Sequence, residues 1–274
     1  MSAAAKRIIV CGGNGFLGSR ICNRSGEPKW NAVTSSATPP VWAHKVTWES
    51  ADILRPATYV SLLKGADYVI HSMGILLEAD YKAVVSGQES PISGLSRAFS
   101  GARGRPTPST ATEDIRPPET KQQLTYENMN RDSAITLAQE ADHAKASAFV
   151  YISAAAGAPV LPARYITTKR EAEDTIASRF PRMRGVFVRP PFLYDPSRPI
   201  TMGMAAMTGV GAMFNTVTGG VLGGFMGAAG TKPLKVETVA EAVVEALEDE
   251  SVRGPVEVPE IEKLAEKAWR KNML

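Results

Sequence analysis

Three side chains near the middle of the sequence have the types and spacing needed to transfer a proton to an oxygen atom. Tyr165 and Lys169, in "RYITTKREAE", are four residues apart, so both project from one face of a helix. Ser153 ends the apolar run "FVYIS", which predicts a strand. An ammonium group favours the tyrosinate, a phenol exchanges a proton with a substrate oxygen, and a hydroxyl holds that oxygen. The three residues therefore suit reduction of a carbonyl group, or the reverse reaction, with hydride from a cofactor. The alternative for Tyr165 and Lys169 is a pair on a helix surface.

A glycine-rich turn near the start of the chain indicates which cofactor this is. Gly12, Gly15 and Gly18, in "CGGNGFLG", have the spacing of a turn in which backbone N–H groups approach a pyrophosphate at the start of a helix. Together with the three later side chains, the turn predicts a bound nicotinamide dinucleotide, either NADP or NAD.

The order of apolar runs and helical patterns predicts the fold that positions these groups. The predicted strands are 8–11, 46–48, 68–71, 149–152 and 186–188, and the predicted helices are 125–144, 166–180, 236–247 and 261–270. This alternation is typical of an α/β fold, with a Rossmann-like, doubly wound parallel sheet that has helices on both faces. Ligands of such folds bind beyond the carboxyl ends of the strands.

The second strand of the expected sheet is missing from the sequence. In a dinucleotide-binding fold that strand follows the first helix and delivers a residue to the ribose about 20 positions after the turn. Here Gly18 is followed by "SRICNRSGEP", in which Arg24 begins a turn, and residues 31–37 are too polar for the middle of a sheet. We therefore expect the chain to lack this strand and the end of its first helix, through an alternative transcript or an incorrect gene model. The alternative is a genuine short variant whose third strand, 46–48, pairs directly with the first.

Two segments depart from the alternating pattern. Residues 84–123 are rich in Ser, Gly, Pro and Thr and predict a flexible surface insertion. Residues 199–231 contain no charged side chain but nine glycines, which argues against a membrane span. We expect a dinucleotide-binding domain over 1–198 and a small substrate-side subdomain over 199–274, with peripheral membrane contact as a further expectation.

Composition argues against several other classes of function. The formal net charge is +3 and the basic residues are spread along the chain, so the sequence predicts no nucleic-acid partner. The two cysteines, Cys11 and Cys22, have neither metal-ligand spacing nor a disulfide framework. The three histidines are far apart in the sequence, and we expect no metal site.

Six motifs, in order along the chain, resemble those of an atypical, extended short-chain dehydrogenase. They are "GGNGFLG", "HSMGILLEADYK", "YENMNRDSA", "YISAAAG", "RYITTKREAE" and "RPPFLYD", within residues 6–247. The likeness is greatest to the fungal mitochondrial NAD(P)-binding proteins associated with coenzyme Q (ubiquinone) biosynthesis. The dehydrogenase-like accessory subunits of respiratory complex I are more distantly similar.

The resemblance assigns cofactor-binding roles to the first half of the chain. It implies that Gly12, Gly15 and Gly18 cradle the pyrophosphate, that Phe16 shapes the turn, and that Arg24 meets an NADP 2′-phosphate, which slightly favours NADP. It further implies that Asp52 lies near the adenine, and that residues 71–74, including His71 and Gly74, line the cofactor. A turn or helix-cap role is the alternative for Asp52.

The resemblance also assigns roles around the reacting atoms. It implies that Ser153, Tyr165 and Lys169 are catalytic, that Asn130 orders the active site from its helix, and that residues 189–192, including Pro190, pass near the nicotinamide. Ordinary packing on a helix surface is the alternative for Asn130.

Two functions follow from the resemblance. The first is an NAD(P)-dependent oxidoreductase of mitochondrial ubiquinone biosynthesis that acts on an apolar, quinone-like carbonyl or alcohol. The second is a non-catalytic, nucleotide-binding structural or regulatory subunit. Either would associate with the coenzyme Q biosynthetic complex or another mitochondrial membrane complex, on the matrix side of the inner membrane. Because "MSAAAKRIIV" runs directly into a predicted strand, we expect any import signal to be internal.

Overall fold

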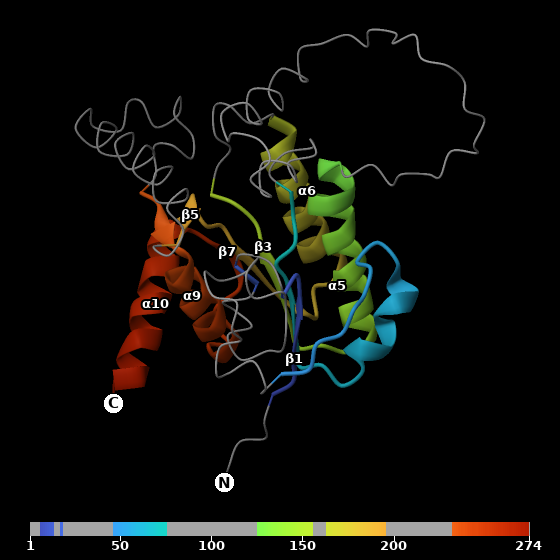
Figure 1. Ribbon diagram of the computed structural model, residues 1–274, viewed down its shortest axis with the longest axis horizontal. Helices are drawn as coiled ribbons and strands as arrows, with labels where there is room; N and C mark the ends of the chain where they lie inside the picture. The colour runs from blue at the N-terminus through green and yellow to red at the C-terminus, as the bar shows by residue number, and fades with distance from the viewer. Residues whose placement is uncertain are drawn as a thin grey trace, which may run out of the picture.

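A parallel sheet at the centre of the molecule supports the predicted site (Figure 1). The computed structural model describes residues 6–13, 17–18, 46–75, 125–155, 163–195 and 232–273. The sheet has the strand order β1-β2-β3-β4-β7. Its strands are β1 (Ile8–Cys11), β2 (Tyr68–His71), β3 (Ala148–Ile152), β4 (Arg184–Val188) and β7 (Gly254–Val256). Since all neighbouring pairs are parallel, their carboxyl ends lie at one edge. A separate small sheet pairs β5 (Leu193–Tyr194) with β6 (Leu234–Lys235).

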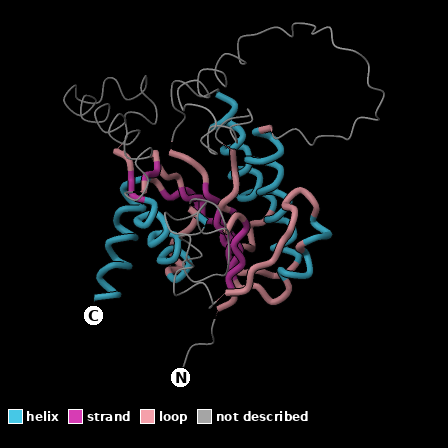
Figure 2. The backbone as a smooth tube through the Cα atoms, viewed as in Figure 1, coloured by secondary structure: helices cyan, strands magenta, loops and turns pink. Residues whose placement is uncertain are grey.

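Helices cover both faces of the central sheet, as Figure 2 shows. One face carries α9 (Val236–Glu248) and α10 (Val258–Met273), and the other carries α5 (Ser133–His143) and α6 (Ala163–Arg179). The short helices η2 (Pro56–Thr58) and η3 (Val60–Leu63) and the π-helix η5 (Glu127–Asp132) lie on the α5 side. Side chains alternate between the two cores along each strand, as Val69 and Ile70 of β2 do. The α/β, Rossmann-like prediction is confirmed.

One predicted strand does not form. Val46–Trp48 has no strand pairing, and the described residues place no strand beside β1 on the side away from β2. A strand needs a hydrogen-bonded neighbour, so the three residues Val-Thr-Trp, which have none, stay irregular. The direct pairing of this run with β1 is therefore wrong. Residues 19–45, where a second strand would have to lie, are outside the described part of the chain.

Buried charges tie the C-terminal helices to the sheet and to each other. Arg184 of β4 is buried and donates hydrogen bonds to the carbonyl oxygens of Ala246 (2.8 Å) and Leu247 (2.9 Å) in the last turn of α9. These oxygens would otherwise lack partners at the helix end. Glu245 of α9 accepts ion pairs from Lys267 (2.9 Å) and Lys271 (2.7 Å) of α10. The α9–α10 hairpin is thus held against the sheet by polar as well as apolar contacts.

Two predicted features lie outside the described residues, namely the insertion at 84–123 and the charge-free segment at 199–231. Within the described ranges, none of the helices has both the length and the apolar character to cross a membrane. The same ranges contain no group of three or more His, Cys, Asp or Glu side chains that could hold a metal ion.

Candidate dinucleotide and substrate site

The glycine turn packs against the end of β2 with no room for side chains. Gly12 has φ +89°, a left-handed conformation that favours glycine. A Cβ atom on Gly18 would lie 2.1 Å from the Gly12 carbonyl oxygen and 2.5 Å from Ser72 Oγ. Ser72 in turn donates through its backbone N–H (2.9 Å) and its hydroxyl (3.0 Å) to the carbonyl of Cys11. The residues Gly12, Gly18 and Ser72 thus form a tight cradle at the carboxyl end of β1, the edge of the sheet at which ligands of such folds bind.

Three predicted cofactor residues, Gly15, Phe16 and Arg24, lie outside the described residues. Asp52 lies in a turn, where its carboxylate accepts a hydrogen bond from the Leu54 N–H (3.0 Å) and faces Arg55 Nε at 3.4 Å. A carboxylate that accepts from the N–H two residues later is typical of a turn residue, which was the alternative role for Asp52. Its predicted place near the adenine stays a prediction.

His71 at the end of β2 is buried, and its ring contacts protein. Its Nε2 lies 2.9 Å from Ser133 Oγ, and Ser133 donates its own proton to the Met129 carbonyl. His71 Nε2 must therefore carry the ring proton, which leaves Nδ1 as an acceptor without a hydrogen-bond partner among the described residues. Burial, together with the charge of Lys169, lowers the pKa of His71 to about 3, so the ring is neutral at physiological pH.

Asn130 orders the backbone that follows β2. Its side-chain oxygen accepts from the Ile75 N–H (2.8 Å), and its amide nitrogen donates to the Ile75 carbonyl (3.1 Å). It lies within the π-helix η5, a form that often occurs at functional sites. Its backbone carbonyl accepts from the Tyr151 hydroxyl. A Cβ atom on Gly74 would lie only 2.9 Å from Asn130 Oδ1, so glycine is needed for this close approach. Asn130 is buried, so surface packing is wrong for it.

The structure brings Ser153, Tyr165 and Lys169 to the carboxyl end of β3. Lys169 Nζ donates to the carbonyl of Ile152 (3.0 Å), the residue before Ser153. The same Nζ lies 5.8 Å from the centre of the Tyr165 ring. The ring of Tyr165 packs edge-on against that of Tyr126, with 5.9 Å between centroids.

The electrostatics of this cluster set its protonation state. Burial raises the pKa of Tyr165 to about 12, with Tyr126 adding to the rise and Arg170 opposing it. Burial lowers the pKa of Lys169 to about 8, with the Glu173 carboxylate opposing the change. Near neutral pH the phenol is therefore protonated and the lysine is mostly charged. In this state the site can give a proton to an oxygen atom.

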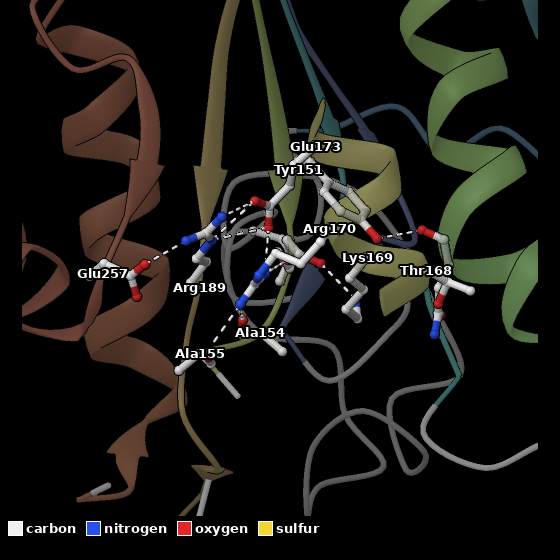
Figure 3. A network of polar contacts seen from close by, with 12 residues as sticks. Tyr151, Ala154, Ala155, Thr168, Lys169, Arg170, Glu173, Arg189 and Glu257 are labelled. Atoms are coloured by element: carbon white, nitrogen blue, oxygen red, sulfur yellow. Dashed lines mark hydrogen bonds and ion pairs between the residues drawn. The ribbon is translucent and has the colours of Figure 1, made fainter. Parts of the chain in front are cut away.

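A network of ion pairs beside the cluster was not predicted (Figure 3). The buried Glu173 pairs with Arg170 (2.7 Å) and with Arg189, which also pairs with Glu257 (2.6 Å). Glu173 raises the pKa of Arg189 above its usual range. The spacing of Arg170 and Glu173, three apart on a helix beside Lys169, was the one signal for it in the sequence. Pro190 is buried after β4, and its carbonyl accepts from the Ala155 N–H at 2.8 Å.

Comparison with known proteins identifies the family. No protein-family profile matches the chain. MIOREX complex component 2 of Saccharomyces cerevisiae is 36% identical over an alignment of 216 residues, which covers 70% of this chain and 74% of the yeast protein. The chain belongs to the family of this MIOREX component. The name of the yeast relative does not mention coenzyme Q, so it gives no support to the expected link with ubiquinone biosynthesis.

Solved structures agree on the fold of this MIOREX-component family member. UDP-glucuronic acid 4-epimerase of Bacillus cereus, in complex with NAD, is 16% identical with a TM-score of 0.52, over 92% of this chain and 78% of the epimerase. RMD of Pseudomonas aeruginosa, complexed with NADPH, is 17% identical with a TM-score of 0.51, over 96% of this chain and 80% of that protein. These structures share the NAD(P)-binding, epimerase-like Rossmann fold.

Proposed function

We propose that this protein is a dinucleotide-binding subunit of a mitochondrial complex of the MIOREX kind. The observation that carries the proposal is its 36% identity to a named component of that complex over most of both chains. Two proteins with this degree of sequence identity usually share the surfaces through which they assemble. The subunit would lie in mitochondria, on the matrix side of the inner membrane.

The cradle formed by Gly12, Gly18 and Ser72 supports the nucleotide part of this proposal. Only glycine fits at Gly12 and Gly18, because a Cβ atom there would meet the chain itself, and glycine turns of this kind let backbone N–H groups approach a pyrophosphate at the start of a helix. The structural neighbours complexed with NAD and with NADPH have the same fold. We propose NADP or NAD as the ligand, with NADP slightly favoured by the expected role of Arg24.

Co-purification from yeast tests the assembly. A tagged copy of this chain would be expressed in Saccharomyces cerevisiae that lacks MIOREX complex component 2, and mitochondrial extracts would be fractionated by size. The proposal expects the tagged chain to migrate with the other components of the complex. Migration at the size of the free chain would contradict it, provided that re-expressed yeast component 2 migrates with the complex in the same strain.

A second candidate function is an NAD(P)-dependent oxidoreductase that acts on an apolar, quinone-like carbonyl. It is favoured by the meeting of Ser153, Tyr165 and Lys169 at one strand end. A nicotinamide bound there would supply or accept hydride. Tyr165 would donate the proton to the substrate oxygen, and the Ser153 hydroxyl would donate a hydrogen bond to the same oxygen. The charge of Lys169 would stabilise the tyrosinate that remains.

Single-turnover reduction of a short-chain coenzyme Q analogue tests this candidate. We expect Tyr165→Phe to abolish turnover while NADPH binding is kept, because only the proton donor is lost. Unchanged turnover in Tyr165→Phe would contradict the mechanism. If a Tyr165→Phe, Lys169→Ala variant still restores function in cells, the subunit role alone is sufficient.

The division at residue 198 and the role of the charge-free segment at 199–231 are also proposals. We propose that this segment contacts substrate or the membrane surface without spanning it, because its glycines lower both helix propensity and transfer energy. Carbonate extraction of mitochondrial membranes should release the protein. Retention in the pellet would indicate a span.

A further inference from the structure

Arg170, next to Lys169 on α6, is bound on several sides at the candidate site. Its Nη1 donates to Ser153 Oγ at 2.9 Å. Its Nη2 donates to the carbonyl oxygens of Ala154 (2.6 Å) and Ala155 (3.1 Å), as Figure 3 shows. The guanidinium therefore holds three consecutive residues after β3, which include the serine expected to touch the substrate.

A buried carboxylate fixes the guanidinium in this place. Glu173 is only 2% exposed and accepts from Arg170 Nη1 at 2.7 Å. The same carboxylate also pairs with Arg189, so it neutralises part of the charge of both arginines. The side chain of Arg170 is 28% exposed. Its charge thus lies at the boundary between the protein interior and the site, where electrostatic interactions are stronger than in bulk water.

The hydrogen bond from Arg170 determines what the Ser153 hydroxyl can do. A hydroxyl has one hydrogen to donate, and Arg170 occupies its oxygen as a donor. In the part of the chain that the structure describes, Ser153 Oγ accepts from Arg170 and makes no hydrogen bond as a donor. The hydroxyl is therefore left to donate to a ligand.

We propose that Arg170 is a positioning residue that commits Ser153 to donating its hydrogen bond, so that the site selects ligands with a carbonyl oxygen or an oxyanion at this point. The positive charge behind the serine increases the polarity of its O–H bond and favours negative charge on the ligand oxygen. The inference rests on the second candidate function for the site, and it names the chemical class of group that binds there.

The contribution of Arg170 can be measured without turnover. The probe is 2-hydroxy-1,4-naphthoquinone, which is an anion at neutral pH, titrated into protein saturated with NADP⁺ so that no hydride is present to reduce it. Arg170→Gln should weaken its binding about tenfold or more, the size expected for a charge-assisted hydrogen bond. Ser153→Ala should weaken binding similarly, and the double variant should lose little more, because Arg170 acts through Ser153.

Controls separate this role from a general effect on folding. Arg179→Gln lies on the same helix, is exposed, and should bind the probe like the parent. Arg170→Gln should fold, because Glu173 keeps its pair with Arg189. Equal probe affinity in Arg170→Gln and the parent would overturn the proposal, as would additive losses in the double variant or no binding by the parent. If the losses of probe affinity are coupled but the parent does not turn over a coenzyme Q analogue, the role of Arg170 in ligand binding is supported and only the oxidoreductase function is rejected.

Discussion

Substituting Gly18 by alanine should greatly lower the affinity for a dinucleotide but only slightly lower the stability of the fold. The added Cβ would lie 2.1 Å from the Gly12 carbonyl oxygen and 2.8 Å from the Gly12 carbonyl carbon. Ordinary contact requires about 3.5 Å, so the turn must move by about 1 Å or more. Because backbone opposes the new methyl group, the strain falls in the upper part of the range of about 1–3 kcal/mol for overpacking.

This strain acts on the conformation that binds pyrophosphate. A cost of about 2–3 kcal/mol in that conformation corresponds to a loss of about 30-fold or more in affinity. NADPH fluorescence titration would measure the affinity, and thermal unfolding would measure stability at the same pH. We expect the unfolding temperature to fall by a few degrees, because the rest of the sheet is unchanged.

Gly185→Ala is the matched control. Its Cβ would lie 3.0 Å from the Phe187 ring, on β4 and away from the turn, and a side chain can yield where backbone cannot. We expect a small loss of stability and parental NADPH affinity. If Gly18→Ala binds NADPH within about twofold of the parent, the cradle is not the pyrophosphate site.

Three further predictions concern buried charges, each tested by urea denaturation. The pKa of Lys169 falls from 10.5 to about 8 in the fold, so its burial opposes folding below pH 8 and this cost disappears toward pH 10.5. The parent should therefore gain up to about 3 kcal/mol of stability between pH 8 and pH 10.5, a gain that Lys169→Met lacks. A stability difference between the two proteins that stays constant over this pH range would refute the prediction. Arg184→Met should lower the free energy of unfolding by about 2–4 kcal/mol, because it leaves carbonyl oxygens at the end of α9 without donors. The matched control Arg179→Met, at an exposed position, should lower it by less than about 0.5 kcal/mol, and equal losses in the two variants would contradict this role of Arg184. Glu245→Gln should cost about 1–3 kcal/mol at pH 7. Burial raises the pKa of Glu245, but hydrogen bonds and charge from Lys271 and Lys267 outweigh it and lower the pKa, so the difference from the parent should shrink as the carboxylate is protonated at low pH. A difference independent of pH would argue against the ion pairs.

The sequence predicted the sheet where strands are long apolar runs. The strands β1, β2, β3 and β4 were predicted in this way, because a strand buried on both faces reads as continuous apolar residues. β7 was missed because "GPV" has three residues and a proline, which are signals of a turn. The run at 46–48 had the composition of a strand, but pairing depends on a neighbour that local sequence does not supply.

The sequence predicted the members of the site better than their contacts. Spacing on a helix was enough to place Tyr165 and Lys169 on one face, and strand order was enough to bring Ser153 to the same edge. The contact from Arg170 to Ser153 joins a helix to a strand end, and no local pattern specifies it. The contact of the His71 ring with Ser133 of α5 is another that no local pattern specifies, and the expected place of His71 beside the cofactor stays a prediction.

Native mass spectrometry of the protein purified from mitochondria tests the central claim most directly. We predict a chain that carries one NADP or NAD and is released from a larger complex on activation in the instrument. The Gly18→Ala variant should still be released from the complex but should lack the nucleotide. A parent protein that is free of nucleotide, or one that is recovered only as an isolated chain, would contradict the proposal of a dinucleotide-binding subunit.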